Sequence, residues 1–339
     1  MTIRQKNPNY HDIDLRDLEM HNTLSFKVLQ GQLQHDAKSM GLKQRIGMLA
    51  GIVQMMFFQL LFFHDDKWSV HLEILITMIN DIHADVLKLF EPRDRAVVTC
   101  DDIPAFLFFC GLLIWIDHQW SVSIGKAPRL SELHDQVLNE FPALFRLQNI
   151  IGCESWVVRT IGRIAGIQEW RNTQAMLGKN ITIGLCKESE QIGDDLNQGL
   201  ERTWKKLQNP SNLSERSSLE TTRIFALAAM TYLHVTISGP RVDLAEIQTS
   251  VRRTLYALNQ LKDNNLLKVL HWPLYLTGCM AIGEDRKYIL DLFGIVHVLY
   301  SGACAQDRYS QRLKEYWAAR EMDPNYNLWE TGAGRPLFI

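Results

Sequence analysis

Apolar residues recur at helical spacing along much of the chain. One stripe steps by three and four positions through Leu72, Leu75, Ile79, Ile82, Val86 and Leu89. A second stripe consists of Leu244, Ile247, Val251, Leu255 and Leu258. Each stripe predicts an amphipathic helix with one buried face, because residues three and four apart lie on the same side of a helix. We expect Pro92 to stop the first helix, because proline cannot continue one.

Two other stretches are apolar almost throughout, residues 47–63 and residues 103–115. Both are shorter than the roughly 20 residues that a membrane-spanning helix requires. The first also contains Gln54 and Gln59. Their composition therefore favours helices buried in a large core and predicts no membrane segment.

No alternating strand pattern, Asn-Gly hairpin or βα alternation interrupts these helices. The sequence predicts an all-α fold, a single large domain of ten or more helices over residues 21–339, after a tail over residues 1–20. The polar stretch 209–218, NPSNLSERSS, is expected to be a loop inside that domain. Ser217 and Glu220 fit a capping box for the next helix, which Gly239 and Pro240 would stop.

Residues 270–281, LHWPLYLTGCMA, combine a histidine, a proline and a cysteine. Pro273 is expected to end the preceding segment and to lie in the first turn of a new helix. That helix has almost no polar face, which predicts burial on all sides. Gly278 would let a neighbouring helix approach, and His271 and Cys279 are interpreted as core residues rather than as a reactive pair.

Composition fits an ordinary globular protein. The 339 residues carry a net charge of −2, so no chain-wide positive field attracts nucleic acid or anionic lipid. The N-terminal residues are polar and lack the apolar core of a signal peptide. Six cysteines are too few for a disulfide scaffold in a chain of this length. We therefore expect an intracellular, reducing setting.

Spacing argues against a zinc site and against a cysteine nucleophile. The cysteines are Cys100, Cys110, Cys153, Cys186, Cys279 and Cys304. No two are close enough to form the ligand pairs of a compact zinc site. His271 lies eight residues before Cys279 with a proline between them, so local activation of that thiol is poor. The sequence predicts no metal and no cofactor.

Paired acids raise the alternative of an all-α, metal-dependent enzyme acting on a phosphate or diphosphate. The pairs are Asp65–Asp66, Asp101–Asp102 and Asp194–Asp195. A further carboxylate one turn later would be needed to hold Mg²⁺, and those positions carry Ser69, Ala105 and Gln198. His-Asp dipeptides, which some all-α phosphohydrolases use, occur at residues 11–12, 35–36, 64–65 and 134–135 without any feature that selects one. No catalytic residue is predicted.

Basic residues form only short clusters. Lys205–Lys206 and Arg252–Arg253 are isolated pairs on mixed segments, and aromatic residues do not interleave with them in the sequence. We interpret both pairs as solvated helix faces, with nucleic-acid binding by this chain a distant alternative.

Several segments resemble the regulatory domain of fungal-specific transcription factors, the helical domain that follows a binuclear zinc-cluster DNA-binding domain. The segments are 65–79 with Trp68 and His71, 151–171, 220–240, 270–281, and 315–339 with Trp317 and Trp329. Their order and spacing extend over nearly the whole chain. The zinc-cluster module of that family, with six closely spaced cysteines, is not found in this sequence.

The resemblance implies a non-catalytic regulatory domain, expected in the nucleus and without direct DNA contact of its own. It would bind protein partners of the transcription machinery, associate with itself, or hold a small-molecule effector between helices. The metal-dependent enzyme remains the alternative, and a stacked-helix scaffold is a third hypothesis, disfavoured because no repeat period is found.

Overall fold

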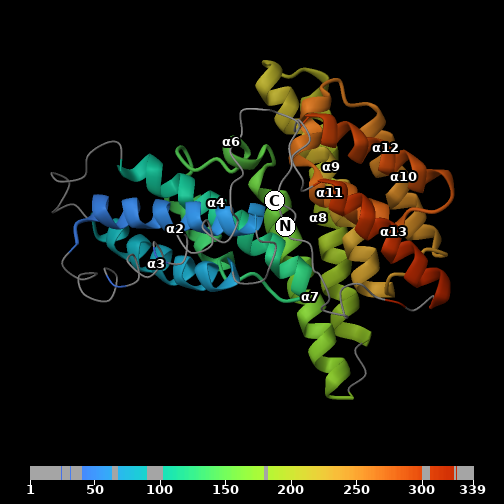
Figure 1. The fold of residues 1–339 in the computed structure, drawn as a ribbon, viewed down its shortest axis with the longest axis horizontal. Coiled ribbons are helices and arrows are strands. Elements are labelled where there is room, and N and C mark those ends of the chain that lie inside the picture. The colour runs from blue at the N-terminus through green and yellow to red at the C-terminus, as the bar shows by residue number, and fades with distance from the viewer. Residues whose placement is uncertain are drawn as a thin grey trace. The chain divides into compact units, whose positions relative to one another are not determined.

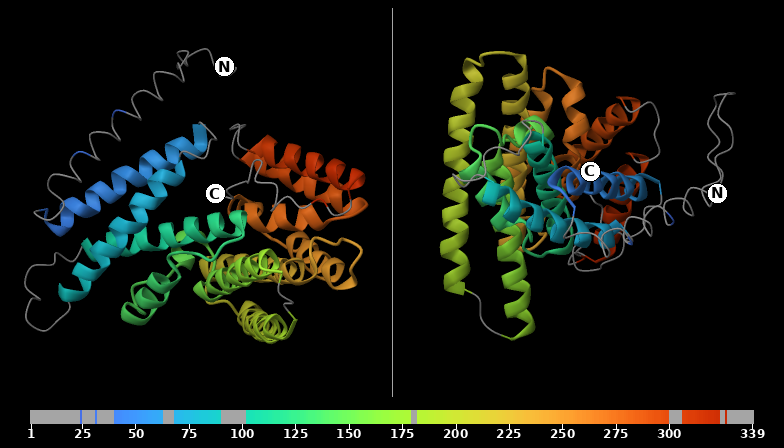
Figure 2. Two further views of the ribbon diagram at one scale, coloured as in Figure 1. Left: turned by 90° about the horizontal axis from the view of Figure 1, so that it is seen from below. Right: turned by 90° about the vertical axis from the view of Figure 1, so that its left-hand side faces the viewer.

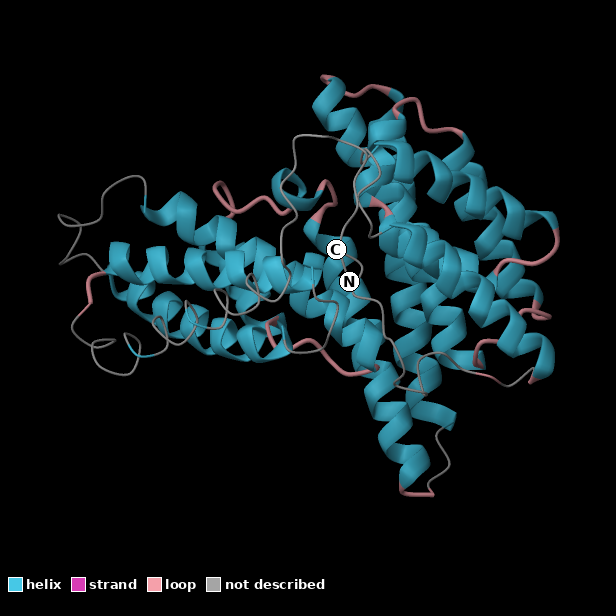
Figure 3. Ribbon diagram, viewed as in Figure 1, coloured by secondary structure: helices cyan, strands magenta, loops and turns pink. Residues whose placement is uncertain are grey.

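The computed structural model describes residues 40–62, 68–89, 102–178, 182–299 and 306–323, together with Leu24, Gly31 and Tyr326. Within these residues every regular element is a helix and no strand occurs, as Figure 3 shows. The all-α class and the expectation of ten or more helices are confirmed. The helices are α2 (Leu42–Phe62), α3 (Trp68–Leu89), α4 (Asp102–Ile124), α5 (Ser131–Glu140), α6 (Gln148–Ile151), α7 (Ser155–Met176), α8 (Thr182–Gln208), α9 (Leu213–Ser238), α10 (Ala245–Asn259), the 3₁₀ helix η1 (Asn264–Val269), α11 (His271–Met280), α12 (Glu284–Leu299) and α13 (Gln306–Met322).

Contacts divide the chain into two compact units, residues 1–113 and residues 114–339. The boundary falls within α4 (Figure 1). The single domain over residues 21–339 stays a prediction. The proposed tail, residues 1–20, lies outside the described residues.

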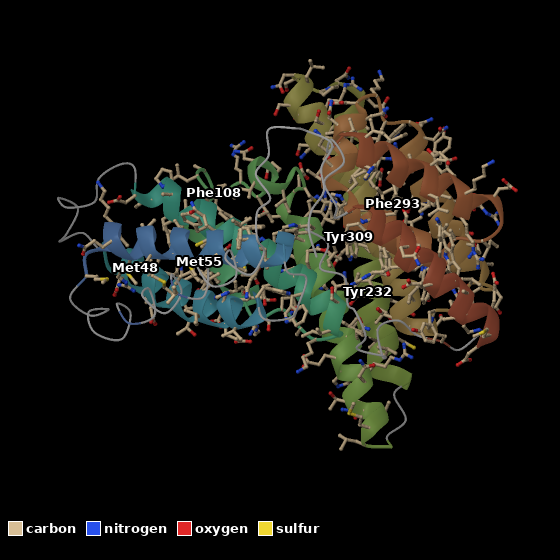
Figure 4. All side chains as sticks on the ribbon, in the orientation of Figure 1. Met48, Met55, Phe108, Tyr232, Phe293 and Tyr309 are labelled. Carbon is tan, nitrogen blue, oxygen red and sulfur yellow. The ribbon has the colours of Figure 1, made fainter. Side chains whose placement is uncertain are left out.

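In the first unit, α2 packs against α3. The predicted stripe on α3 is buried at Leu72, Leu75, Ile79, Ile82 and Val86. Met48 and Met55, two turns apart on α2, are also buried (Figure 4). The Arg45 guanidinium forms an ion pair with Asp85. Because Arg45 is near the start of α2 and Asp85 near the end of α3, the two helices run antiparallel.

In the second unit, α9 is the central helix. It packs against α7, α8, α10 and α11, as the views in Figures 1 and 2 allow the reader to follow. Its alanine-rich middle, residues 224–233, is buried at every position. A helix apolar on all sides must be covered on all sides, and α9 meets this condition through its four partners.

Helix α11 confirms the interpretation of residues 270–281. All ten of its residues are buried, and Pro273 is its third residue, within the first turn. A Cβ atom built on Gly278 would lie 2.9 Å from both Ile289 of α12 and Leu313 of α13, so the glycine permits close helix contact. On the same side of the unit, the rings of Phe293 and Tyr309 stack at 5.8 Å (Figure 4).

The start of α9 corrects two expectations. Only residues 209–212 lie outside a helix, so the loop predicted over residues 209–218 is shorter than expected. The N-cap is Asn212, whose side chain accepts a hydrogen bond of 2.8 Å from the Glu215 N–H. The Glu215 carboxylate in turn accepts 2.6 Å from the Ser211 N–H. This reciprocal pattern performs the capping that we had assigned to Ser217 and Glu220.

Helix α4 corrects the length argument made for residues 103–115. It continues to Ile124 and, of the described helices, is the one long and apolar enough to cross a membrane. Of its most apolar window, 72% is buried inside the protein. Such burial is typical of a core helix, in line with the composition-based expectation.

Candidate functional site

The described cysteines are placed as inert or isolated thiols. Cys110, Cys153 and Cys279 are buried, whereas Cys186 is exposed on α8. Burial raises the pKa of each buried thiol well above its ordinary value, because a thiolate is poorly solvated there. His271 is also buried, and desolvation lowers its pKa to about 4. The residues Cys100 and Cys304 lie outside the described part of the chain.

The described acidic residues do not converge on a metal site. Asp195 accepts a hydrogen bond of 2.5 Å from Arg163, and Glu188 pairs with the same guanidinium at 2.8 Å. Asp102 lies in the first turn of α4. Over the described ranges, no three His, Cys, Asp or Glu side chains come together as a metal site would need. Residues 65, 66 and 101 lie outside those ranges, and the enzyme alternative receives no support here.

The one described His-Asp dipeptide separates its two side chains. His134 is fully buried, with its ring 5.7 Å from that of His118. Asp135 instead forms an ion pair of 2.7 Å with Arg159. The dipeptides at residues 11–12, 35–36 and 64–65 lie outside the described residues. The pair at residues 134–135 therefore does not form a joint ligand set.

A surface groove formed by α8, α9 and α10 is the strongest candidate for a functional site. We call it the basic groove. Its main part has a volume of about 690 Å³, within the range of known ligand sites. It is lined by Asn197, Leu200, Glu201, Trp204, Arg223, Leu227, Thr249, Arg252, Arg253 and Tyr256.

Trp204 and Arg223 form the centre of the basic groove. The Arg223 guanidinium lies 4.7 Å from the centre of the Trp204 ring, a cation–π contact between α8 and α9. Trp204 remains 47% exposed although it is a large aromatic residue. Burial lowers the pKa of Arg223, and the nearby Arg253 charge lowers it further. Since an arginine pKa starts far above neutrality, Arg223 still carries its charge.

Helix α10 supplies the basic wall of the groove. Arg252, Arg253 and Tyr256 are exposed, and Tyr256 is 59% accessible. The one acidic residue that lines this part is Glu201, whose carboxylate pairs with Lys205 at 2.7 Å. Three arginines therefore face one carboxylate that already has a cationic partner. The main part of the groove is positive although the whole chain is slightly negative.

A smaller, separate cavity lies beside this main part, and Trp204 and Arg223 line both. Here charges of both signs are present. Arg216 and Glu220 lie 3.9 Å apart on successive turns of α9. Burial raises the pKa of Glu220, an effect that Arg216 partly offsets. Lys262, just beyond α10, adds a further cation to this lining.

The basic groove was not predicted from the sequence. Arg252 and Arg253 are exposed on α10, as predicted for a solvated helix face, and the aromatic residues Tyr256 and Trp204 line the same groove. Lys205 and Lys206 instead form ion pairs, with Glu201 and Glu154. The available signal was Trp204, a large aromatic residue that is 47% exposed one turn after the buried Leu200, on a helix that also buries Ile192 and Leu196.

Comparison with known proteins identifies the family. The sequence profile described as the fungal specific transcription factor domain matches residues 8–333. The chain belongs to this family. The match includes every segment that resembles this family, apart from the last residues, 334–339, of the C-terminal segment 315–339. No solved structure is significantly similar to the chain.

Curated relatives of this fungal specific transcription factor domain are transcription regulators. The chain is 26% identical over 316 residues to pestheic acid cluster transcriptional regulator 3 of Pestalotiopsis fici, covering 83% of this chain and 54% of that protein. It is 24% identical to a trichothecene biosynthesis transcription regulator of Fusarium sporotrichioides, and the alignment covers 85% of this chain and 71% of that regulator. It is also 24% identical to transcription factor dibT of Pestalotiopsis microspora, and the alignment covers 68% of this chain and 43% of that factor. The chain thus spans only about half the length of two of these relatives.

Proposed function

We propose that this chain acts as the non-catalytic regulatory domain of a fungal transcription regulator and works in the nucleus. The observation that carries this proposal is the family match over residues 8–333, together with relatives that are named transcription regulators.

The target genes are proposed from the names of the relatives. One is a regulator of the pestheic acid cluster, another regulates trichothecene biosynthesis, and a third is the ustiloxin B cluster transcription factor of Aspergillus flavus. We infer that this chain regulates genes for the biosynthesis of a small molecule. Deleting its gene should change the transcript levels of such a gene group, and RNA sequencing of the deletion strain measures this.

Regulation would proceed through binding to other molecules rather than through DNA contact by this chain. The chain carries a net charge of −2, and the main part of the basic groove is lined by three arginines and one glutamate. The candidates are protein partners of the transcription machinery, a second copy of the chain, and a small-molecule effector. The basic groove is the described surface best suited to such binding.

A tethering experiment tests the regulatory function. The complete 339-residue chain is fused to a foreign DNA-binding domain, and a reporter gene under the matching operator is measured in a fungal host. We expect the fusion to raise or lower reporter transcription relative to the DNA-binding domain alone. A fluorescent fusion of the same chain should accumulate in the nucleus. A reporter signal equal to that of the unfused domain would contradict the proposed function.

A further inference from the structure

The basic groove is elongated. Along α8 its lining extends from Asn197 to Gln208, and along α10 and the residues after it from Thr249 to Lys262. At about 1.5 Å per helical residue, the helical part of each wall is roughly 15–17 Å long. Two adjoining cavities along walls of this length suit an extended segment or a helix of about three turns better than a compact small molecule.

The lining has the composition of a protein-binding hot spot. Tryptophan, tyrosine and arginine are the residues that most often dominate binding energy at protein interfaces. Trp204, Tyr256, Arg252 and Arg253 are all exposed in the groove, while Leu200 and Leu227 form a buried apolar floor. An apolar anchor side chain can therefore be covered by two aromatic rings, with cations beside it.

The charges of the groove select the partner. Within the part of the chain that the structure describes, neither Arg252 nor Arg253 takes part in an ion pair. The one carboxylate that lines the main part of the groove, on Glu201, is already paired with Lys205. A partner that supplies carboxylates would give these guanidinium groups the acceptors that the groove itself lacks, in a geometry that arginine binds bidentately.

We propose that the basic groove docks a short acidic segment of another protein, which places an apolar side chain against Trp204 and Tyr256 and carboxylates on Arg252 and Arg253. This inference rests on the proposed function, because it identifies the groove as the surface through which the regulatory domain meets a protein partner. Complementary charge would speed association and make binding sensitive to salt.

Fluorescence anisotropy with defined peptides tests the proposal. The probe is a fluorescein-labelled peptide of about 12 residues, long enough for three helical turns, in which Leu and Phe recur every three or four positions and Asp and Glu fill the others. A second peptide carries Asn and Gln in place of the acids. The full chain should bind the acidic peptide at least about tenfold more tightly than the amide peptide. Raising the salt concentration should weaken only the first interaction.

Matched variants assign the binding to the groove. The double substitution Arg252→Gln and Arg253→Gln should weaken acidic-peptide binding about tenfold or more, and Trp204→Ala should do the same. The control is Arg202→Gln with Lys287→Gln, which removes the same charge from exposed positions outside the groove lining. Circular dichroism and thermal melts should show all three variants folded, since every altered side chain is exposed.

Three outcomes would overturn the proposal. The first is equal binding of both peptides. The second is a loss of binding in the control variant as large as in the Arg252 and Arg253 variant. The third is binding of a duplex DNA oligonucleotide as tight as that of the acidic peptide, if this binding is also lost when Arg252 and Arg253 are substituted. The groove would then be a general polyanion site. If the peptide experiment gives one of these outcomes but the tethered chain still regulates the reporter, the docking proposal fails and the proposed function stands.

Discussion

Trp272 and Trp204 show how the surroundings of a residue decide its role. Trp272 on α11 is 1% exposed, and its ring stacks on Phe225 at 5.8 Å and meets Tyr232 edge-on at 6.2 Å. Trp204 on α8 is 47% exposed and contacts the charged Arg223. The first tryptophan contributes to stability, and the second is available to a partner.

Substituting Trp272 tests the core. Replacement by alanine removes a ring packed between two other aromatic side chains of α9 and leaves a large cavity. We expect Trp272→Ala to lower the free energy of unfolding by roughly 3–5 kcal/mol, the usual range for a buried large aromatic residue. Denaturant unfolding of the two proteins measures the difference. A loss below about 1 kcal/mol would show that this ring is not central to the core.

His134 is a buried group that opposes folding at acidic pH. Neither of its ring nitrogens has a hydrogen-bond partner among the described residues. Desolvation, followed by the nearby His118, lowers its pKa from 6.5 to about 2 in the folded chain. Between these two values the unfolded chain binds a proton that the folded chain does not bind. Stability therefore falls as the pH decreases below about 6.5.

The substitution His134→Leu should remove this contribution. Leucine is apolar, similar in size, and leaves no buried nitrogen without a partner. We compare the free energy of unfolding of the variant with that of the unaltered chain at two pH values. The difference in favour of the variant should be about 2 kcal/mol larger at pH 5 than at pH 8, because one pKa unit corresponds to about 1.4 kcal/mol. Thermal or urea unfolding at the two pH values measures it. An identical difference at both values would contradict the assignment.

At the scale of elements, the sequence was informative where periodicity was strong. The stripes on α3 and α10 and the proline in the first turn of α11 were all predicted. Helix ends were less predictable. Both Asn212–Glu215 and Ser217–Glu220 have the spacing of a capping box, and only the structure shows that the first one caps α9. Helix α4 is longer than the apolar run 103–115. Asp117 and His118 follow that run and resemble the polar end of a helix in the sequence, but both are buried inside α4.

Two glycines on α8 offer a direct test of how this helix packs. A Cβ atom on Gly199 would overlap the Trp156 ring of α7, whereas one on Gly193 would lie 3.8 Å from Leu233, an ordinary contact. Alanine favours a helix over glycine by about 1 kcal/mol in both places. We expect Gly193→Ala to raise the melting temperature and Gly199→Ala to lower it, because the Trp156 ring must move. Two variants that melt alike would argue against the close contact of α7 and α8.

At the scale of the whole molecule, the family could be recognised from ordered motifs, but the basic groove could not. Its lining residues come from three helices, and Trp204, Arg223 and Tyr256 lie 19 and 33 residues apart in sequence. No local pattern joins them. Only the packing of α8 and α10 against α9 brings their side chains to one surface.

The groove also explains how a slightly acidic chain can present a basic surface. Elsewhere, arginines such as Arg159 and Arg163 pair with carboxylates of neighbouring helices. In the groove, Arg252 and Arg253 stand beside aromatic residues instead. The main part of the groove thus carries more positive than negative charge, which complements an acidic partner.

In the proposed function, this domain regulates transcription through the basic groove. The most direct test is the tethered reporter measured for three full-length chains: the unaltered chain, the Arg252→Gln and Arg253→Gln variant, and the Arg202→Gln and Lys287→Gln control. At equal protein levels, we predict that the groove variant loses most of the change in reporter transcription and that the control keeps it. Equal regulation by all three chains would contradict the claim.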